Sequence, residues 1–125
     1  MGLTIALNRG RILKECLPLI TAAGYAPAER FEDSRKLVFP TVDGAHRLIV
    51  MRGADVPTYV EYGAADVGIS GKDVLAELDL DVVEMVDLGF GGCRFVVAEP
   101  EGAHASIEEQ YAHLGVIRVA TKYPR

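Results

Sequence analysis

The sequence predicts an α/β fold built on a mostly parallel sheet, and three observations lead to this prediction. Short apolar runs rich in β-branched residues alternate with segments of helical periodicity. The apolar runs lack polar alternation, which is typical of strands that are covered on both faces. The chain has 125 residues, of which 50% are hydrophobic and 25% charged, so it is long enough to fold on hydrophobic burial without disulfides or metals.

Seven apolar runs are expected to form strands, and three segments are expected to form helices. The strands are residues 3–7, 37–39, 47–51, 67–70, 82–86, 95–98 and 116–120. The first helix, 11–23, has one apolar face and stops at Gly24, while Pro18 predicts a kink within it or a split into two helices. The second, 55–63, begins where Asp55 can cap it, with Pro57 in the first turn, and the third covers 73–78.

The charge distribution excludes some classes of partner. The net charge is −5, from 13 basic and 18 acidic residues, which argues against a nucleic-acid binder or a protein of anionic membrane surfaces. Eight of the basic residues lie within the first 52. No apolar run approaches the roughly 20 residues needed to span a bilayer, and the first apolar run is too short for a signal peptide, so we expect a cytoplasmic protein. Two cysteines, Cys16 and Cys93, are expected to be buried reduced thiols.

Small or hydroxyl residues and a cation follow four of the expected strands, at residues 8–11, 52–55, 71–73 and 121–124. Ligands of open α/β sheets bind at the carboxyl ends of strands, so four such turns favour a ligand rich in phosphates. Each cation taken alone is more often a solvated surface charge, and only the repetition after four strands makes the binding interpretation of the set equally good. Asp55 and Asp73 fit helix N-terminal positions, with contact to a ligand hydroxyl or a metal as the alternative.

Other polar features carry weaker signals. The glycines at 89, 91 and 92 indicate a hinge between two lobes, a tight turn or, least of all, a phosphate loop. His46, His104 and His113 lack the spacing of metal ligands and are expected at the surface. No metal ligand is assigned, and no Walker turn, nucleophile elbow or Cys/His pair supports covalent catalysis.

Five motifs resemble the catalytic subunit of ATP phosphoribosyltransferase, the first enzyme of histidine biosynthesis, and together they cover most of the chain. They are LTIALNRGRI at 3–12, DSRKLVFPT at 33–41, RGADVPTYVEYG at 52–63, ADVGISGKD at 65–73 and ATKYP at 120–124. The version SRKL is similar to the short form of the family, which works with a histidyl-tRNA-synthetase-like regulatory subunit. The resemblance implies phosphoribosyl transfer from phosphoribosyl pyrophosphate to N1 of ATP, with Mg²⁺ and release of pyrophosphate.

The resemblance also implies roles for particular residues. Arg11 and Arg35 would neutralise the leaving pyrophosphate as catalytic residues. Arg9, which stands where the family more often has lysine, and Gly10 would contact substrate. The nucleotide side would be lined by Arg52, Asp55, Gly71, Lys72 and Asp73, and the second lobe would contribute Lys122.

The family's architecture is two α/β lobes around a cleft, like the type II periplasmic binding proteins. Residues 1–90 would form the first lobe and residues 91–125 the start of the second, which is expected to be truncated before the family's phosphoribosyl pyrophosphate loop. A homodimer within a hetero-oligomer is expected. The alternative functions are a noncatalytic phosphate- or nucleotide-binding lobe and a fragment without turnover.

Overall fold

The computed structural model describes residues 2–32, 34–102 and 106–125, so His104 and Asp33, the first residue of the DSRKLVFPT motif, lie outside the described residues. The chain divides into two compact units, Met1–Gly91 and Gly92–Arg125. The boundary falls within the glycine cluster at 89–92, where Gly89 and Gly91 adopt positive φ angles of 72° and 71°. The assignment of these units to two lobes of a larger architecture stays a prediction.

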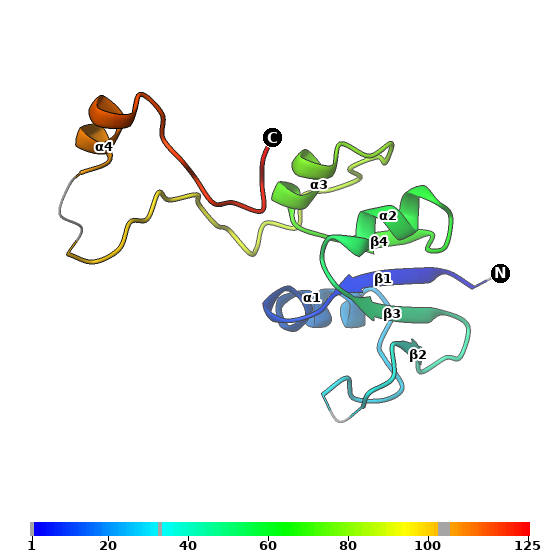
Figure 1. The fold of residues 1–125 in the computed structure, drawn as a ribbon. Helices are drawn as coiled ribbons and strands as arrows, with labels where there is room; N and C mark the ends of the chain where they lie inside the picture. The colour runs from blue at the N-terminus through cyan, green and yellow to red at the C-terminus, as the bar shows by residue number, and fades with distance from the viewer. Residues whose placement is uncertain (1, 33, 103–105) are drawn as a thin grey trace. The chain divides into compact units, whose positions relative to one another are not determined.

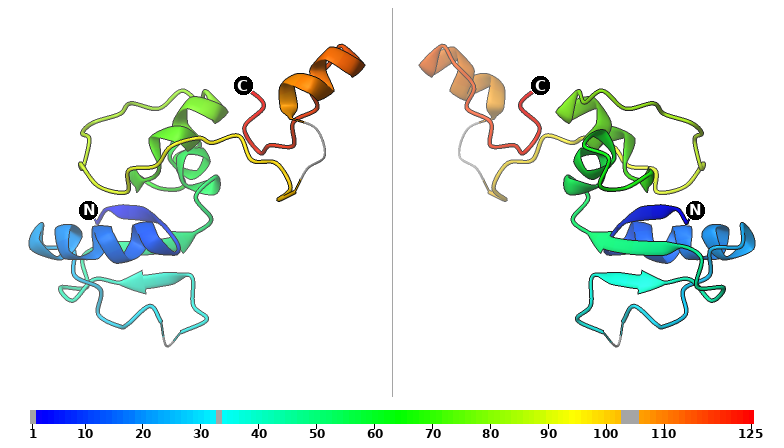
Figure 2. Two further views of the ribbon diagram at one scale, coloured as in Figure 1. Left: turned by 90° about the vertical axis from the view of Figure 1, so that its left-hand side faces the viewer. Right: turned by 90° about the vertical axis from the view of Figure 1, so that its right-hand side faces the viewer.

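The first unit contains a four-stranded mixed sheet with the order β2-β3-β1-β4 (Figure 1). The strands are β1 (Thr4–Asn8), β2 (Val38–Pro40), β3 (Arg47–Met51) and β4 (Val67–Ile69). β1 pairs in parallel with both β3 and β4, whereas β2 pairs antiparallel with β3, as the adjacent cyan and green arrows of Figure 2 show. The α/β fold class and the positions of these four strands are therefore confirmed, with bounds shifted by one residue at most.

Two helices cover opposite faces of this sheet. Ile5 and Leu7 of β1 pack in one cluster with Cys16 and Ile20 of α1 (Arg11–Ala22). Ala6 belongs to a second cluster, with Val56 of α2 (Asp55–Glu61). Because successive strand residues point to opposite faces, α1 and α2 lie on opposite faces, and β1 is buried between them as its unbroken apolar run predicted.

The helix ends follow the local sequence. Gly10 precedes α1 with φ 93° and ψ −142°, a conformation that residues with a Cβ rarely adopt, and Gly24 follows the helix with φ 94°. α1 continues through Pro18 as one helix, so the expected split into two helices is wrong. Asp55 is the first helical residue of α2 rather than its cap, since Ala54 occupies the cap position and no side chain caps the helix. The prediction that Asp55 caps α2 is thus wrong.

Three expected strands are absent from the described residues, namely 82–86, 95–98 and 116–120. Apart from Val82, which is partly buried, their large apolar side chains are exposed, from 52% at Ile117 to 81% at Met85. A strand exists only through hydrogen bonds to a neighbour, and these runs pair with no other described segment. Cys93, expected to be buried at the start of such a strand, is exposed for the same reason.

Two further helices complete the chain. α3 (Lys72–Leu78) begins one residue before its expected start. In the second unit, α4 (Ile107–Leu114) is a helix that the sequence analysis missed, although the hydroxyl of Ser106 and the carboxylate of Glu109 form a capping box and Gly115 ends it with φ 72°. Among the described residues, no helix is both long enough and apolar enough to cross a membrane.

Candidate functional site

The carboxyl ends of β1, β3 and β4 meet at one edge of the sheet. Asn8 at the end of β1 is in register with Met51 at the end of β3, and Leu7 is in register with Ile69 at the end of β4. The backbone N–H of Arg9 also donates to the carbonyl of Met51 at 2.8 Å. The turns that follow the three strands are therefore neighbours, as the repeated cationic turns predicted. We call residues 8–11, 52–55 and 70–73 the carboxyl edge.

The two central turns of the carboxyl edge separate at a switch point of the sheet. From β1 the chain continues to α1 on one face, and from β3 it continues to α2 on the other. Such divergence opens a crevice at the carboxyl ends of open α/β sheets, where ligands bind. Gly53 lies against the side chain of Asn8 here, and the hydroxyl of Ser70 donates to the carbonyl of Gly53 at 3.4 Å.

The cations near this edge differ in how their charge is neutralised. Arg11 pairs with Glu15 one turn further along α1 at 3.4 Å, and Lys72 pairs with Glu84 at 3.2 Å. Arg9, Arg35 and Arg52 are exposed, and within residues 2–32, 34–102 and 106–125 none of them forms an ion pair. Two of these arginines, Arg9 and Arg52, follow neighbouring strand ends, so the carboxyl edge carries uncompensated positive charge suited to an anion.

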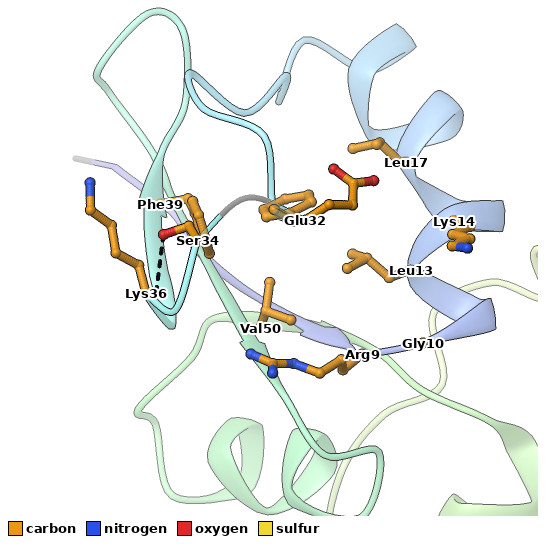
Figure 3. A pocket seen from close by; sticks show the side chains of 11 residues that line it. Arg9, Gly10, Leu13, Lys14, Leu17, Glu32, Ser34, Lys36, Phe39 and Val50 are labelled. Carbon is orange, nitrogen blue, oxygen red and sulfur yellow. Dashed lines mark hydrogen bonds between the residues drawn. The ribbon is translucent and has the colours of Figure 1, made fainter.

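A pocket of about 250 Å³ opens beside the start of α1 (Figure 3). Its polar lining comes from Arg9, Gly10 and Lys14 on one wall, and from Glu32, Ser34 and Lys36 on the other. The remaining lining residues are apolar: Leu13, Leu17, Phe31, Phe39 and Val50. Phe31 and Phe39 meet edge to face, with ring centroids 4.7 Å apart. The lining of the pocket thus combines five apolar residues with three basic residues and one carboxylate.

The structure brings most of the sequence-predicted site residues to one region of the first unit. Arg9 and Gly10 line the pocket, and Arg11 begins α1 directly after them. Arg35 does not line the pocket, but its neighbours Ser34 and Lys36 do. The carboxyl edge also contains Arg52, Asp55, Gly71, Lys72 and Asp73.

Lys122 belongs to the second unit, where its ammonium lies 4.9 Å from the ring centroid of Tyr123. Nothing in this unit tests its expected contact with substrate. The catalytic and substrate-binding roles of all ten residues stay predictions.

Sequence reasoning missed four polar residues of the pocket, Lys14, Glu32, Ser34 and Lys36. Lys14 was detectable in principle, because it lies one helical turn after Gly10 and its backbone N–H donates to the Gly10 carbonyl at 3.4 Å. Ser34 and Lys36 flank Arg35 in the sequence. Only the three-dimensional structure shows that both residues line the same wall of the pocket.

His46 is a structural residue rather than the surface histidine that was expected. Its side chain is 21% exposed, its Nδ1 accepts the N–H of Leu3 at 2.9 Å, and its ring meets Tyr25 edge to face. His46 lies in a loop next to a strand, and nothing in the local sequence indicates a hydrogen bond to a residue 43 positions away. His113 is exposed as expected.

The buried thiol of Cys16 has an altered ionisation. Burial raises the pKa of Cys16 above its ordinary value, and the protonated thiol donates to the carbonyl of Leu13 at 3.4 Å. A neutral thiol in the core is unreactive. Among the described residues, no group of three or more His, Cys, Asp or Glu side chains could hold a metal ion.

Comparison with known proteins decides the family. The model of the family HisG: ATP phosphoribosyltransferase matches residues 52–125. The chain belongs to the ATP phosphoribosyltransferase family. A curated ATP phosphoribosyltransferase of Acidithiobacillus ferrooxidans is 52% identical over 124 residues, which are 98% of this chain and 57% of that protein. That of Sorangium cellulosum is 50% identical over 123 residues, or 98% of this chain and 54% of that protein.

The chain therefore spans little more than half the length of these curated ATP phosphoribosyltransferases. A solved structure, the ATP phosphoribosyl transferase (HisG:HisZ) complex from Thermotoga maritima, matches with a TM-score of 0.53 and 26% identity. The match covers 65% of this chain and 37% of that chain. The resemblance expected from the five sequence motifs is confirmed at the level of the family.

Proposed function

We propose that this chain carries the nucleotide- and pyrophosphate-facing part of an ATP phosphoribosyltransferase that catalyses the first step of histidine biosynthesis. The observation that supports this most directly is the carboxyl edge, where the turns of three parallel strands bring Arg9 and Arg52 together without a carboxylate partner among the described residues. Membership of the ATP phosphoribosyltransferase family supports ATP and phosphoribosyl pyrophosphate as the phosphate-rich ligands.

The reaction exchanges one bond for another at the anomeric carbon of the ribose. The bond from this carbon to the pyrophosphate oxygen breaks, and a bond to N1 of ATP forms, with pyrophosphate as the leaving group. Negative charge grows on pyrophosphate in the transition state, so guanidinium groups held beside it lower the barrier. We assign this role to Arg11 and Arg35. Arg11 must exchange its contact with Glu15 for the leaving group.

The remaining site residues divide between the turns of the carboxyl edge and the second unit. Arg9 and Gly10 border the pocket and would bind substrate phosphates. The nucleotide would lie along Arg52, Asp55, Gly71, Lys72 and Asp73, and Lys122 would contact substrate from the second unit.

We propose that Mg²⁺ enters the site with the phosphorylated substrates. Mg²⁺ keeps several waters and is commonly bound by one or two carboxylates together with substrate phosphates. Asp55 and Asp73 at the carboxyl edge fit such a donor set, while no cluster of three ligands occurs among the described residues. The ion would neutralise phosphate charge and orient the leaving pyrophosphate.

The proposed assembly follows the short form of the family. The matched structure from Thermotoga maritima is a HisG:HisZ complex, which supports a histidyl-tRNA-synthetase-like regulatory partner. We propose a homodimer within that hetero-oligomer, a two-lobe architecture like the type II periplasmic binding proteins, and a cytoplasmic location.

The experiment begins with the protein expressed from its complete gene. Its intact mass is compared with the 13.5 kDa of these 125 residues, and pyrophosphate release is then measured with ATP, phosphoribosyl pyrophosphate, Mg²⁺ and the regulatory partner. Release that requires both substrates supports the transferase. ATP binding without release supports the noncatalytic nucleotide-binding lobe, and no binding of either substrate contradicts both functions.

A further inference from the structure

We propose that Glu29 is a positioning residue for the anion site, because its ion pair with Lys36 closes the loop that carries Arg35. We call residues 29–36 the arginine loop; of these, Phe31, Glu32, Ser34 and Lys36 line the pocket. The inference rests on the proposed function in one respect, the role of Arg35 beside the leaving pyrophosphate. It adds a residue outside the five sequence motifs and outside the pocket lining.

The ion pair is the shortest that the structure describes. The ammonium of Lys36 donates to both carboxylate oxygens of Glu29 at 2.8 Å, whereas the other described ion pairs span 3.2–3.8 Å. The two residues are seven positions apart, and the described residues between them form no helix or strand. A contact of this kind joins the two ends of an irregular segment.

Both ends of the arginine loop are anchored to the sheet. Before it, the N–H of Ala28 donates to the carbonyl of Pro40 at 2.9 Å. After it, the N–H of Val50 donates to the carbonyl of Leu37 at 2.8 Å. Phe31 fixes its middle, since the ring is buried against Phe39. With these anchors in place, the Glu29–Lys36 pair restricts the part of the loop that lies nearest to Arg35.

Arg35 is thereby held between two constrained neighbours. The backbone N–H of Lys36 donates to the hydroxyl of Ser34 at 3.1 Å, and the Lys36 side chain is bound at its far end by Glu29. Figure 3 shows this side chain extending away from Leu13 and Val50 on the other side of the pocket. Because the backbone on both sides of Arg35 is restricted, this residue loses less conformational entropy when its guanidinium binds pyrophosphate.

A competing arrangement makes the opposite prediction. If Lys36 itself bound the anion, Glu29 would be a competitor that keeps the ammonium out of the pocket, and neutralising Glu29 would tighten the binding of pyrophosphate. If Glu29 instead positions Arg35, its neutralisation slows transfer. The sign of the effect therefore separates the two roles.

The test compares Glu29→Gln with the unchanged protein, expressed from its complete gene and assayed with its regulatory partner. Because the pair is half exposed, we expect kcat to fall about two- to fivefold while KM for ATP stays unchanged. Glu29→Asp, which keeps the charge, should recover part of the loss. In a Lys36→Gln background the effect of Glu29→Gln should disappear, since both changes break one contact.

Glu108→Gln is the matched control, because it removes the same charge from an exposed position of the second unit and should leave kcat unchanged. The inhibition constant for pyrophosphate is also measured for each variant, because it shows whether Glu29 competes with the anion for Lys36. Tighter inhibition of the Glu29→Gln protein, or an undiminished loss of kcat in the Lys36→Gln background, would overturn the proposal.

A second readout does not depend on catalysis. Trypsin cuts after Arg30, Arg35 and Lys36 within the arginine loop, and we expect these cuts to become faster in Glu29→Gln than in Glu108→Gln while the melting temperature stays the same. Equal cutting rates would overturn the loop-closing role, even in a protein that transfers phosphoribosyl groups. Lack of transfer by the unchanged protein, with faster cutting of the variant, would instead contradict the proposed function alone.

Discussion

Gly53 approaches the side chain of Asn8 so closely that a Cβ at position 53 would lie 2.9 Å from Nδ2 and 3.1 Å from Oδ1 of Asn8. The two residues belong to the turns after β3 and β1, on either side of the switch point of the sheet. The absence of a side chain at position 53 therefore lets these turns, and the arginines beside them, lie together.

Gly53→Ala is expected to push the two turns apart. The added methyl group must displace the Asn8 amide, which is the end of a flexible side chain, so we expect a loss of at most about 1 kcal/mol of the free energy of unfolding and a lower affinity for pyrophosphate. Urea denaturation and calorimetric titration measure the two effects. Adding Asn8→Ala should restore stability, because it removes the clashing amide; a double variant as unstable as Gly53→Ala would show that the Asn8 contact is not the cause.

The sheet of the first unit could be predicted from sequence because each of its strands has a local signal that tertiary structure then confirms. Ile5 and Leu7 alternate with Ala6 within an unbroken apolar run, and all three are buried. The runs at 82–86, 95–98 and 116–120 carry the same signal. Apolarity indicates that a segment seeks burial, but whether it becomes a strand depends on a partner that sequence periodicity does not show.

The part of the candidate site that follows from chain topology could be predicted from the sequence. Parallel pairing places the ends of neighbouring strands at one edge, so Arg9 and Arg52 could be grouped from their positions after strands. The pocket wall made by Ser34 and Lys36 could not, because it depends on an irregular loop that is anchored through Phe31. The hydrogen bond from Leu3 to His46 is equally nonlocal.

Arg35→Ala is expected to lower turnover far more than it weakens ATP binding. A guanidinium that acts on the leaving pyrophosphate stabilises charge that exists in the transition state, and the loss of one such group costs about 10²–10³-fold in kcat. Steady-state kinetics and equilibrium ATP binding separate the two quantities. Arg118→Ala, at an exposed position of the second unit, is the control. Unchanged turnover in the Arg35→Ala protein would remove this residue from the reaction.

The two thiols are expected to react at very different rates. Cys93 is exposed, whereas Cys16 is fully buried and its pKa is raised by burial. A thiol reagent such as Ellman's reagent should therefore label one cysteine quickly and the second only at the rate of unfolding. Mass spectrometry of the labelled peptides identifies each site, and Cys93→Ser should abolish the fast phase. Rapid labelling of Cys16 in the folded protein would contradict its burial.

The raised pKa of Cys16 also predicts how stability depends on pH. The unfolded chain ionises this thiol near its ordinary pKa of 9.0, while the folded chain keeps it protonated to higher pH. The contribution to stability is therefore fully present below pH 9 and is lost as the pH rises through the folded pKa. Urea midpoints measured across this window should fall more steeply for the natural protein than for Cys16→Ala. If the urea midpoints of the two proteins changed with pH in parallel, the raised pKa of Cys16 would be contradicted.

Phe39 connects the hydrophobic core to the candidate site, and its truncation should affect both. The ring is 1% exposed, supports Phe31 edge to face and lines the pocket. Phe39→Ala is expected to cost about 3–5 kcal/mol of the free energy of unfolding, because it removes buried area and leaves a cavity. The milder Phe39→Leu should fold but release the arginine loop, which faster trypsin cleavage after Arg35 would report. Val38→Ala, at the exposed neighbouring position of β2, should change neither quantity; a loss as large as that of Phe39→Leu would place the support for this loop in the strand itself rather than in the ring.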